Sequence, residues 1–287
     1  MKRTLRYALS VTVSALIVGA SSTAALASTA PGLGTATSFA VLAGTPDITN
    51  VGNTVISGSL GISPAASVTG FPPGTVTNGT IQAGTPAAGT AKSDLTAAYG
   101  RAALSPCNFN KSNKNLGGLT LTPGTYCQTT APTLTGTLTL SGNGVFIFQI
   151  GSTLVTAPGA TVRLTNGAQP CNVFWQVSSS ATLDTTTTFV GTIMANTSIS
   201  LNNGATIAGR ALAQTGKVTM INNKITASTT CNAVSTSRVP RIPRAGAGPS
   251  QGDGFPWILA MVAGVLASGG AVGLGMGVRT RRRSRLT

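Results

Sequence analysis

The chain has 287 residues, of which 36 are glycine, 8% are charged, 5% are aromatic and none is histidine. This composition favours tight turns and β-structure over helix. The formal net charge of +15 is concentrated near the two ends, because residues 28–235 contain only eight basic and three acidic side chains. These charges are scattered and lack interleaved aromatic residues, so we do not expect the chain to bind nucleic acid.

The chain begins with the features of a secretory signal peptide. A basic start precedes an apolar run that ends near Val18, and positions 25–27 read A-L-A, which matches an A-x-A cleavage site. An uncleaved membrane helix is the alternative, but the apolar run is short and small residues follow it. We predict that residues 1–27 are a signal peptide and that residues 28–234 form the exported domain.

Two groups of predicted strands flank a single predicted helix. Residues 33–70 and 115–144 contain short alternating strands separated by Gly, Pro and Asn corners. Between them, residues 86–104 form the one good helical stretch of the domain. Its apolar residues share one face at helical spacing, namely Leu95, Ala98, Tyr99 and Ala102.

Residues 145–226 contain variations on one unit of about twenty residues, with three short strands separated by polar corners. The equivalent positions are Ile150, Val177, Ala195 and Ala213, and the last two steps are each 18 residues long. Such a repeat is typical of a solenoid, in which each coil buries its apolar side by stacking on its neighbours. We interpret residues 33–70 as further coils of the same solenoid.

Alternation along each strand predicts which side chains face solvent, because successive residues point to opposite sides. In the second strand of each unit, we predict an inward column of Leu154, Leu183, Leu201 and Met220. The same strands should carry an outward ladder of Thr153, Thr182, Ser200 and Thr219. In the third strand we predict an outward ladder of Thr161, Thr188 and Thr206, followed by Lys224.

The first strand of each unit is apolar on both sides. Phe148 and Trp175 should face inward, whereas Ile147 and Phe174 should face outward. A strand that is apolar on both faces requires a cover, and we predict that the helix of residues 86–104 provides it. The expected fold is therefore mainly β, a three-faced β-solenoid with one long helix alongside and two exposed, Thr-rich faces.

The four cysteines are Cys107, Cys127, Cys171 and Cys231, and an exported domain is a setting in which disulfides form. Four cysteines allow three pairings, of which we favour Cys107–Cys127 and Cys171–Cys231. The first would close a loop after the helix, and the second would join an insertion near Ala168 to the end of the last coil. We expect no zinc site, since the chain has no histidine and no CxxC pair.

The C-terminal residues have the composition of a membrane anchor. Residues 255–278 contain no charged side chain in 24 positions, which is long enough to cross a bilayer. Residues 279–287 contain five arginines, which favour a cytoplasmic location for this tail. Residues 235–254 form a linker rich in Pro, Gly and Arg. We predict a protein held at the surface of a Gram-positive bacterium by its cell membrane.

A short motif in the linker suggests a second mode of attachment. The residues Ile242, Pro243, Arg244, Ala245 and Gly246 resemble a relaxed form of the sorting motif Leu-Pro-x-Thr-Gly, with Ile for Leu and Ala for Thr. Motif, apolar helix and basic tail occur in the order of a Gram-positive sorting signal. Because two positions depart from the consensus, a plain membrane anchor is favoured over attachment to peptidoglycan by a sortase.

No arrangement of residues indicates catalysis. General acid–base chemistry uses a histidine or paired carboxylates within reach of one another. The domain contains only Asp47, Asp94 and Asp184, far apart in sequence, with no Glu and no His. We therefore expect neither a catalytic site nor a metal or other cofactor, and we expect a binding surface instead.

Five sequence strings occur in one order along the predicted domain: LGTATSFAVLAG, GFPPGTV, LGGLTLTPGTYC, VFIFQIGSTL and NVFWQVSSSATL. Together they resemble the ice-binding-like family of microbial secreted proteins, and the resemblance covers residues 33–231. It implies an irregular right-handed β-solenoid with a long helix packed alongside, in agreement with the repeat. It also implies binding to ice.

The outward Thr and Ser columns would form the surface that contacts ice. Stiff β-branched side chains on stacked strands present a fixed grid of methyl and hydroxyl groups. The predicted ice-binding residues are Thr153, Thr182, Ser200, Thr219, Thr161, Thr188 and Thr206. The alternative is a non-enzymatic surface adhesin or wall protein of the same fold, which would bind a glycan or another cell.

Overall fold

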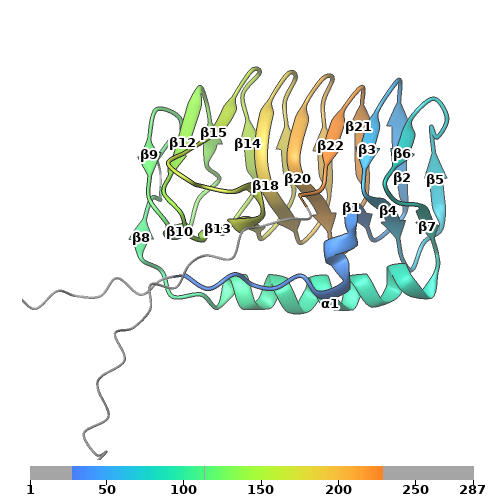
Figure 1. Ribbon diagram of the computed structural model, residues 1–287, viewed down its shortest axis with the longest axis horizontal. Coiled ribbons are helices and arrows are strands. Elements are labelled where there is room, and N and C mark those ends of the chain that lie inside the picture. The colour runs from blue at the N-terminus through green and yellow to red at the C-terminus, as the bar shows by residue number, and fades with distance from the viewer. Residues whose placement is uncertain (1–27, 113, 229–287) are drawn as a thin grey trace, which may run out of the picture. The chain divides into compact units, whose positions relative to one another are not determined.

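The chain folds into a stack of β-coils with one helix running along its side (Figure 1). The computed structural model describes residues 28–112 and 114–228. Contacts divide the chain into residues 1–236 and 237–287, and all described residues belong to the first of these units.

The described part before the long helix forms short strands and one 3-10 helix. These are η1 (Gly34–Ser38), β1 (Phe39–Ala43), β2 (Asp47–Val51), β3 (Val55–Ser57), β4 (Ser59–Ile62), β5 (Ser67–Thr69), β6 (Thr75–Thr77) and β7 (Ile81–Ala83). The long helix α1 (Pro86–Ala103) follows them, close to the predicted bounds.

After α1 the chain returns to strands. These elements are β8 (Phe109–Asn110), β9 (Thr120–Leu121), β10 (Gly124–Gln128), β11 (Thr133–Leu134), β12 (Thr137–Ser141), β13 (Phe146–Ile150), β14 (Leu154–Thr156), β15 (Thr161–Thr165), η2 (Pro170–Asn172), β16 (Val173–Val177), β17 (Ala181–Leu183), β18 (Thr188–Ala195), β19 (Ile199–Leu201), β20 (Thr206–Ala213), β21 (Val218–Ile221) and β22 (Lys224–Thr226).

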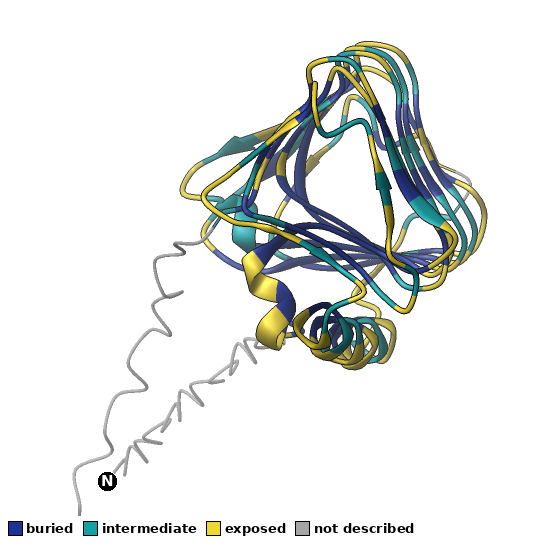
Figure 2. Ribbon diagram, turned by 90° about the vertical axis from the view of Figure 1, so that its right-hand side faces the viewer, coloured by how far each residue is buried: buried dark blue, intermediate teal, exposed yellow. Residues whose placement is uncertain are grey.

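The coils enclose a triangular cross-section, so the solenoid has three faces (Figure 2). One face, which we call the seven-strand face, is the sheet β11-β14-β17-β19-β21-β2-β5. A second sheet of fifteen strands supplies the other two faces. Its part beneath α1 is the covered face, which includes β1, β4, β10, β13 and β16. Its remaining part is the third face, which includes β3, β6, β12, β15 and β22.

The coils stack in an order that differs from their order in the chain. The strands of the last coil, β21 and β22, pair in parallel with β2 and β3 near the N-terminus, and β20 pairs with β1. The first coil therefore stacks on the last, and we call this junction the seam. The α1 helix connects the two ends, because it leaves the N-terminal coils and runs along the solenoid to β8 at the opposite end (Figure 1).

Inward-facing apolar side chains fill the solenoid, and a stack of aromatic rings occupies part of it. Phe109, Tyr126, Phe148 and Trp175 lie side by side on the adjacent strands β8, β10, β13 and β16, and Phe189 of β18 adjoins Trp175. Successive ring centroids are 3.9 to 5.4 Å apart. The buried Trp175 Nε1 donates to Val190 O at 2.9 Å, so its polar atom is satisfied. Register places Ile150, Val177, Ala195 and Ala213 side by side, which confirms the repeat.

The helix covers the doubly apolar strands, as predicted. Its buried residues Leu95, Ala98 and Ala102 pack in one cluster with Ile147 and Phe174. The first residues of α1 explain where it begins. Thr85 Oγ1 accepts a hydrogen bond from Ala88 N at 3.3 Å, and Pro86 occupies the first turn.

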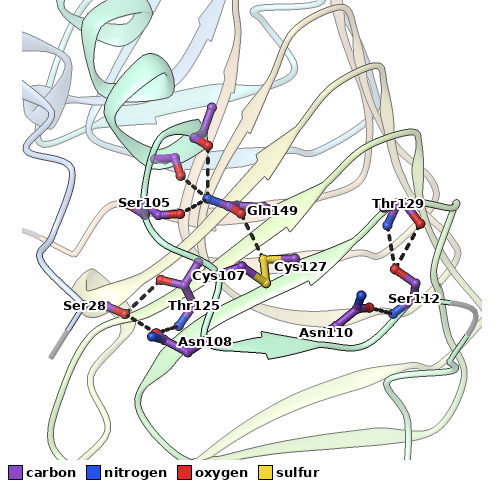
Figure 3. The surroundings of a disulfide bond; sticks show 12 residues. Ser28, Ser105, Cys107, Asn108, Asn110, Ser112, Thr125, Cys127, Thr129 and Gln149 are labelled. Carbon is purple, nitrogen blue, oxygen red and sulfur yellow. Dashed lines mark hydrogen bonds between the residues drawn. A yellow bond between two sulfur atoms is a disulfide. The ribbon is translucent and has the colours of Figure 1, made fainter. Parts of the chain in front are cut away.

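A disulfide and a glutamine fix the other end of α1 (Figure 3). Cys107 and Cys127 form the first predicted disulfide, with their Cα atoms 5.9 Å apart. Gln149 Nε2 donates to the carbonyl oxygens of Ala102 and Ser105 at 2.8 and 2.7 Å, which satisfies backbone groups where the helix ends.

Several predictions concern residues outside the described part of the chain. They are the signal peptide at 1–27, the pairing of Cys171 with Cys231, the linker at 235–254 with its motif at 242–246, the span at 255–278 and the tail at 279–287. These stay predictions. Within residues 28–112 and 114–228, no helix is long and apolar enough to cross a membrane.

Candidate functional site

One outward column runs along the middle of the seven-strand face and contains no charged residue. Backbone register places these residues side by side on successive strands, in the order Thr133, Val155, Thr182, Ser200, Thr219, Thr49 and Thr69. We call this set the central column. Its members are exposed or half-buried. The residues before and after them on the strands β17, β19 and β21 are buried, as strict alternation requires.

The structure confirms three members of the predicted ladder and corrects the fourth. Thr182, Ser200 and Thr219 lie side by side, but the residue beside Thr182 is Val155 rather than Thr153. The inward column shifts in the same way, since Leu154 pairs with Ala181 and not with Leu183.

The physical reason for the error is that a slip of two residues preserves alternation. Such a slip keeps apolar side chains inside and polar side chains outside, whereas a slip of one would reverse them. The corner lengths give the correct register. Leu154 follows Ile150 by four positions, and Ala181 also follows Val177 by four. Thr153 therefore lies just before β14, in a half-buried position at the border of the face.

Sequence reasoning missed the members of the central column that lie outside residues 145–226. Thr49 and Thr69 come from coils before the helix, and Thr133 comes from the coil after it. The sequence does show an apolar residue beside each of them, namely Ile48, Val68 and Leu134. However, the repeat could not show that Thr49 would lie beside Thr219, because the seam joins residues far apart in the chain.

Exposed apolar side chains widen the face at the seam. Val51 and Ile221 pair across β2 and β21 and are 64% and 36% exposed. Each lies two residues after a threonine of the central column, so the two strands present Thr49 with Val51 and Thr219 with Ile221. Alternate residues of a strand are about 6.7 Å apart and neighbouring strands about 4.8 Å apart. The four side chains therefore form a compact grid of methyl and hydroxyl groups.

Charged residues lie only at the margins of this grid. Lys217 precedes β21 and Asp47 is the first residue of β2. Asp184 lies at the corner toward the third face, where its Oδ1 accepts from Asn202 Nδ2 at 3.0 Å and from Thr185 N at 2.7 Å. These hydrogen bonds, the Asn202 one first, hold the pKa of Asp184 below its usual value.

The third face carries the other predicted ladder but has charges within it. Thr161, Thr188 and Thr206 lie side by side and are exposed or half-buried, as predicted. Lys224 continues the same column on β22. Arg163 lies two residues after Thr161 on β15 and is exposed. This face therefore offers shorter uncharged stretches than the seven-strand face.

Neither a metal cluster nor paired carboxylates occur in the described residues. No group of three or more His, Cys, Asp or Glu side chains within residues 28–112 and 114–228 is placed to hold a metal ion. Asp94 is instead structural, because its Oδ2 accepts from Thr35 N and Thr35 Oγ1 at 2.7 and 2.6 Å and ties α1 to η1. An open hollow of about 320 Å³ near the start of α1 contains no ionisable lining residue.

A profile of the family described as Ice-binding-like matches residues 41–226, which is nearly the whole solenoid. This chain belongs to the ice-binding-like family. The resemblance carried by the five sequence strings is thus confirmed, and the described residues carry the mainly β fold with parallel strands and one long helix that the resemblance implies.

Individual members of the ice-binding-like family are similar over the same region. An ice-binding protein of Nostoc sp. (strain HG1) is 50% identical over 198 residues, which cover 67% of this chain and 72% of the relative. A solved ice binding protein from an Antarctic biological consortium is 46% identical with a TM-score of 0.66, covering 69% of this chain and 91% of that one. The solved ice-binding protein of Antarctomyces psychrotrophicus is 36% identical with a TM-score of 0.68, covering 70% of this chain and 100% of that one.

Proposed function

We propose that this protein binds ice through its seven-strand face, without catalysing a reaction. The observation that carries the proposal is the central column, which continues across seven strands without a charge. The similar proteins named above, which are described as ice-binding proteins, support it. They give no support to the alternative of a glycan- or cell-binding adhesin.

The physical basis is a rigid surface that holds water in a repeating arrangement. Hydrogen-bonded parallel strands fix the spacing between coils, and β-branched threonine and valine have few side-chain rotamers. Hydroxyl groups can hydrogen-bond to water while the neighbouring methyl groups restrict its orientations. Such a grid needs little reorganisation when it meets the ordered oxygen lattice of a crystal.

The seven-strand face fits this role better than the third face because of charge. Lys224 lies within the Thr column of the third face, whereas Asp47 and Lys217 of the seven-strand face lie outside the central column, two residues before Thr49 and Thr219. A strongly hydrated cation within the column opposes an ice-like arrangement of the first water layer. On the seven-strand face, the grid around Thr49, Thr219 and their apolar neighbours adjoins the seam near one end of the solenoid. We therefore propose that the strands β19, β21, β2 and β5 make the principal contact.

The experiment that tests the function uses the exported domain. Residues 28–236 contain all described elements and end where the contacts divide the chain. Because 70% of this chain covers the whole of the Antarctomyces structure, the matched part folds as a unit in that relative. Produced in an oxidising compartment, the domain should lower the freezing point relative to the melting point and slow ice recrystallisation. If the domain showed neither of these effects at millimolar concentration, that result would contradict ice binding.

We also propose that the domain is held at the cell surface. The signal peptide would export it, residues 255–278 would stop transfer and the arginine-rich tail would stay inside. If a sortase acts, it should cut between Ala245 and Gly246 and join the protein to peptidoglycan. A detergent-soluble protein that ends at Thr287 would exclude that step, and native protein free in the medium would contradict surface attachment altogether.

A further inference from the structure

A left-handed residue turns the corner between the seven-strand face and the third face on four successive coils. It occupies the same position each time, two residues before the threonine or lysine that begins the third-face strand. These residues and their φ angles are Gly159 (69°), Thr186 (55°), Gly204 (74°) and Asn222 (49°). Matching backbone hydrogen bonds join the coils here, from Gly159 N to Thr185 O, Thr186 N to Asn203 O and Gly204 N to Ile221 O.

Thr186 is the unusual member of this set. Glycine adopts a positive φ without steric cost and asparagine tolerates it, whereas a β-branched residue there is strained. The strain does not serve packing, because the Thr186 side chain is exposed. A Cβ built on Gly159 or Gly204 would lie 3.9 and 3.7 Å from its side-chain atoms, which is ordinary contact distance. Glycine adopts the same left-handed conformation at the corners on either side, so it would fit the corner at Thr186 without strain.

Buried and local hydrogen bonds hold this corner in place. Thr156 Oγ1 accepts from Asp184 N at 2.8 Å and shares a second hydrogen bond of 2.8 Å with Thr187 Oγ1, where both threonines are buried. Asp184 Oδ1 accepts from Thr185 N at 2.7 Å. Strained residues persist where their surroundings over-determine them, and they occur most often at sites that contact a ligand. The Thr186 side chain adds a hydrogen bond from its hydroxyl to Thr185 O, at 2.7 Å.

We propose that Thr186 contacts the bound ice surface and extends the contact from the seven-strand face around its corner. This inference rests on the proposed ice binding. Thr186 follows Thr182 of the central column by four residues and precedes Thr188 of the third face by two. Its side chain stands between two glycine corners, so no neighbouring side chain shields it. The network beneath it supplies a fixed position, which lowers the entropy cost of a surface contact.

Two substitutions at Thr186 separate a contact role from a structural role. Thr186→Gly removes the side chain and the strain, so the unfolding midpoint should stay the same or rise, by up to about 4 °C for a domain of this size. Thermal hysteresis of the domain should nevertheless fall by about half, because the affected coil is one of several that we place in contact. Thr186→Val keeps the shape and methyl groups but loses the hydroxyl bond to Thr185, so it should retain hysteresis and lose some thermal stability.

The matched control lies at a corner away from the seven-strand face. Asn166 is also left-handed, with φ of 51°, and it lies between β15 of the third face and β16 of the covered face. Asn166→Gly should leave hysteresis unchanged. Full hysteresis in Thr186→Gly, alongside its loss in Thr219→Tyr, would overturn the role of Thr186 and leave the proposed face intact. Full hysteresis in Thr219→Tyr as well would contradict the assignment of the seven-strand face, whereas no hysteresis in the native domain would contradict ice binding itself.

Discussion

Thr219 of β21 lies directly beside Thr49 of β2, although the two residues belong to the last and first parts of the solenoid. The pair brings two separate segments of the chain into one surface. It follows that the seam must be closed before the central column is continuous. Interactions that close the seam should therefore affect the stability of the whole domain, whereas substitutions of outward residues should affect only recognition.

The guanidinium of Arg210 is one such interaction at the seam. Arg210 is 2% exposed, and its Nη2 donates to Thr37 O at 2.7 Å and to Ser228 O at 2.8 Å. A lysine at this position cannot reproduce the fork that reaches two carbonyl groups. We predict that Arg210→Lys lowers the free energy of unfolding by about 2 kcal/mol, because a buried charge loses hydrogen bonds. Urea unfolding of the domain measures this, and a change below about 0.5 kcal/mol would contradict it.

Lys92 should make the free energy of unfolding change with pH in the alkaline range. It joins α1 to the seam by donating to the carbonyl oxygens of Ala213 and Gln214. Burial lowers the pKa of Lys92 from 10.5 to about 8. Between these values the unfolded chain binds more protons than the folded chain, so the free energy of unfolding should rise with pH. The contribution of Lys92 should grow by about 2 kcal/mol between pH 7.5 and 9.5.

The matched variant for this effect is Lys92→Met, which fills similar space without titrating. The difference in unfolding free energy between the native domain and the variant should change with pH in favour of the native domain across this range. Parallel pH profiles for the two proteins would show that Lys92 does not carry the effect.

The Cys107–Cys127 disulfide should stabilise the domain without contributing to recognition. It closes a segment with a sequence separation of 20, for which chain entropy predicts about 3 kcal/mol. It lies beside the end of α1 and Gln149, on the covered face (Figure 3). Replacing both cysteines by serine should lower the unfolding midpoint and leave thermal hysteresis unchanged at temperatures where the variant is folded. Lost hysteresis in a folded variant would contradict this separation.

The sequence predicted the local pattern well because that pattern depends on nearby residues. Alternation placed Phe148 and Trp175 inside and Ile147 outside under the helix, and this follows from period two alone. Register between coils is a different matter. Matching leucine with leucine aligned Leu154 with Leu183. The number of residues in the corner instead determines that Leu154 pairs with Ala181.

The seam and the corner strain lay beyond sequence reasoning for another reason. Pairing of β2 with β21 depends on how α1 returns the chain to the far end of the stack, which no repeat period encodes. The left-handed Thr186 lies in a corner where Asp184 N donates to Thr156 Oγ1 on the neighbouring coil. Threonine in the sequence indicates a strand rather than a positive φ. The pairing at the seam and the strained corner can be recognised only once the coils are placed beside one another.

The central claim is that the seven-strand face binds ice, and thermal hysteresis of two matched variants tests it most directly. Thr219→Tyr places a bulky ring in the middle of the central column, and Thr206→Tyr places the same ring on the third face. Both positions are half-buried and point outward, so stability should change similarly and little. We predict that Thr219→Tyr lowers hysteresis at least about tenfold, since a misfit of 1.4 kcal/mol in binding is tenfold, while Thr206→Tyr keeps the native value. Equal hysteresis in both variants, or loss only in Thr206→Tyr, would contradict the assignment.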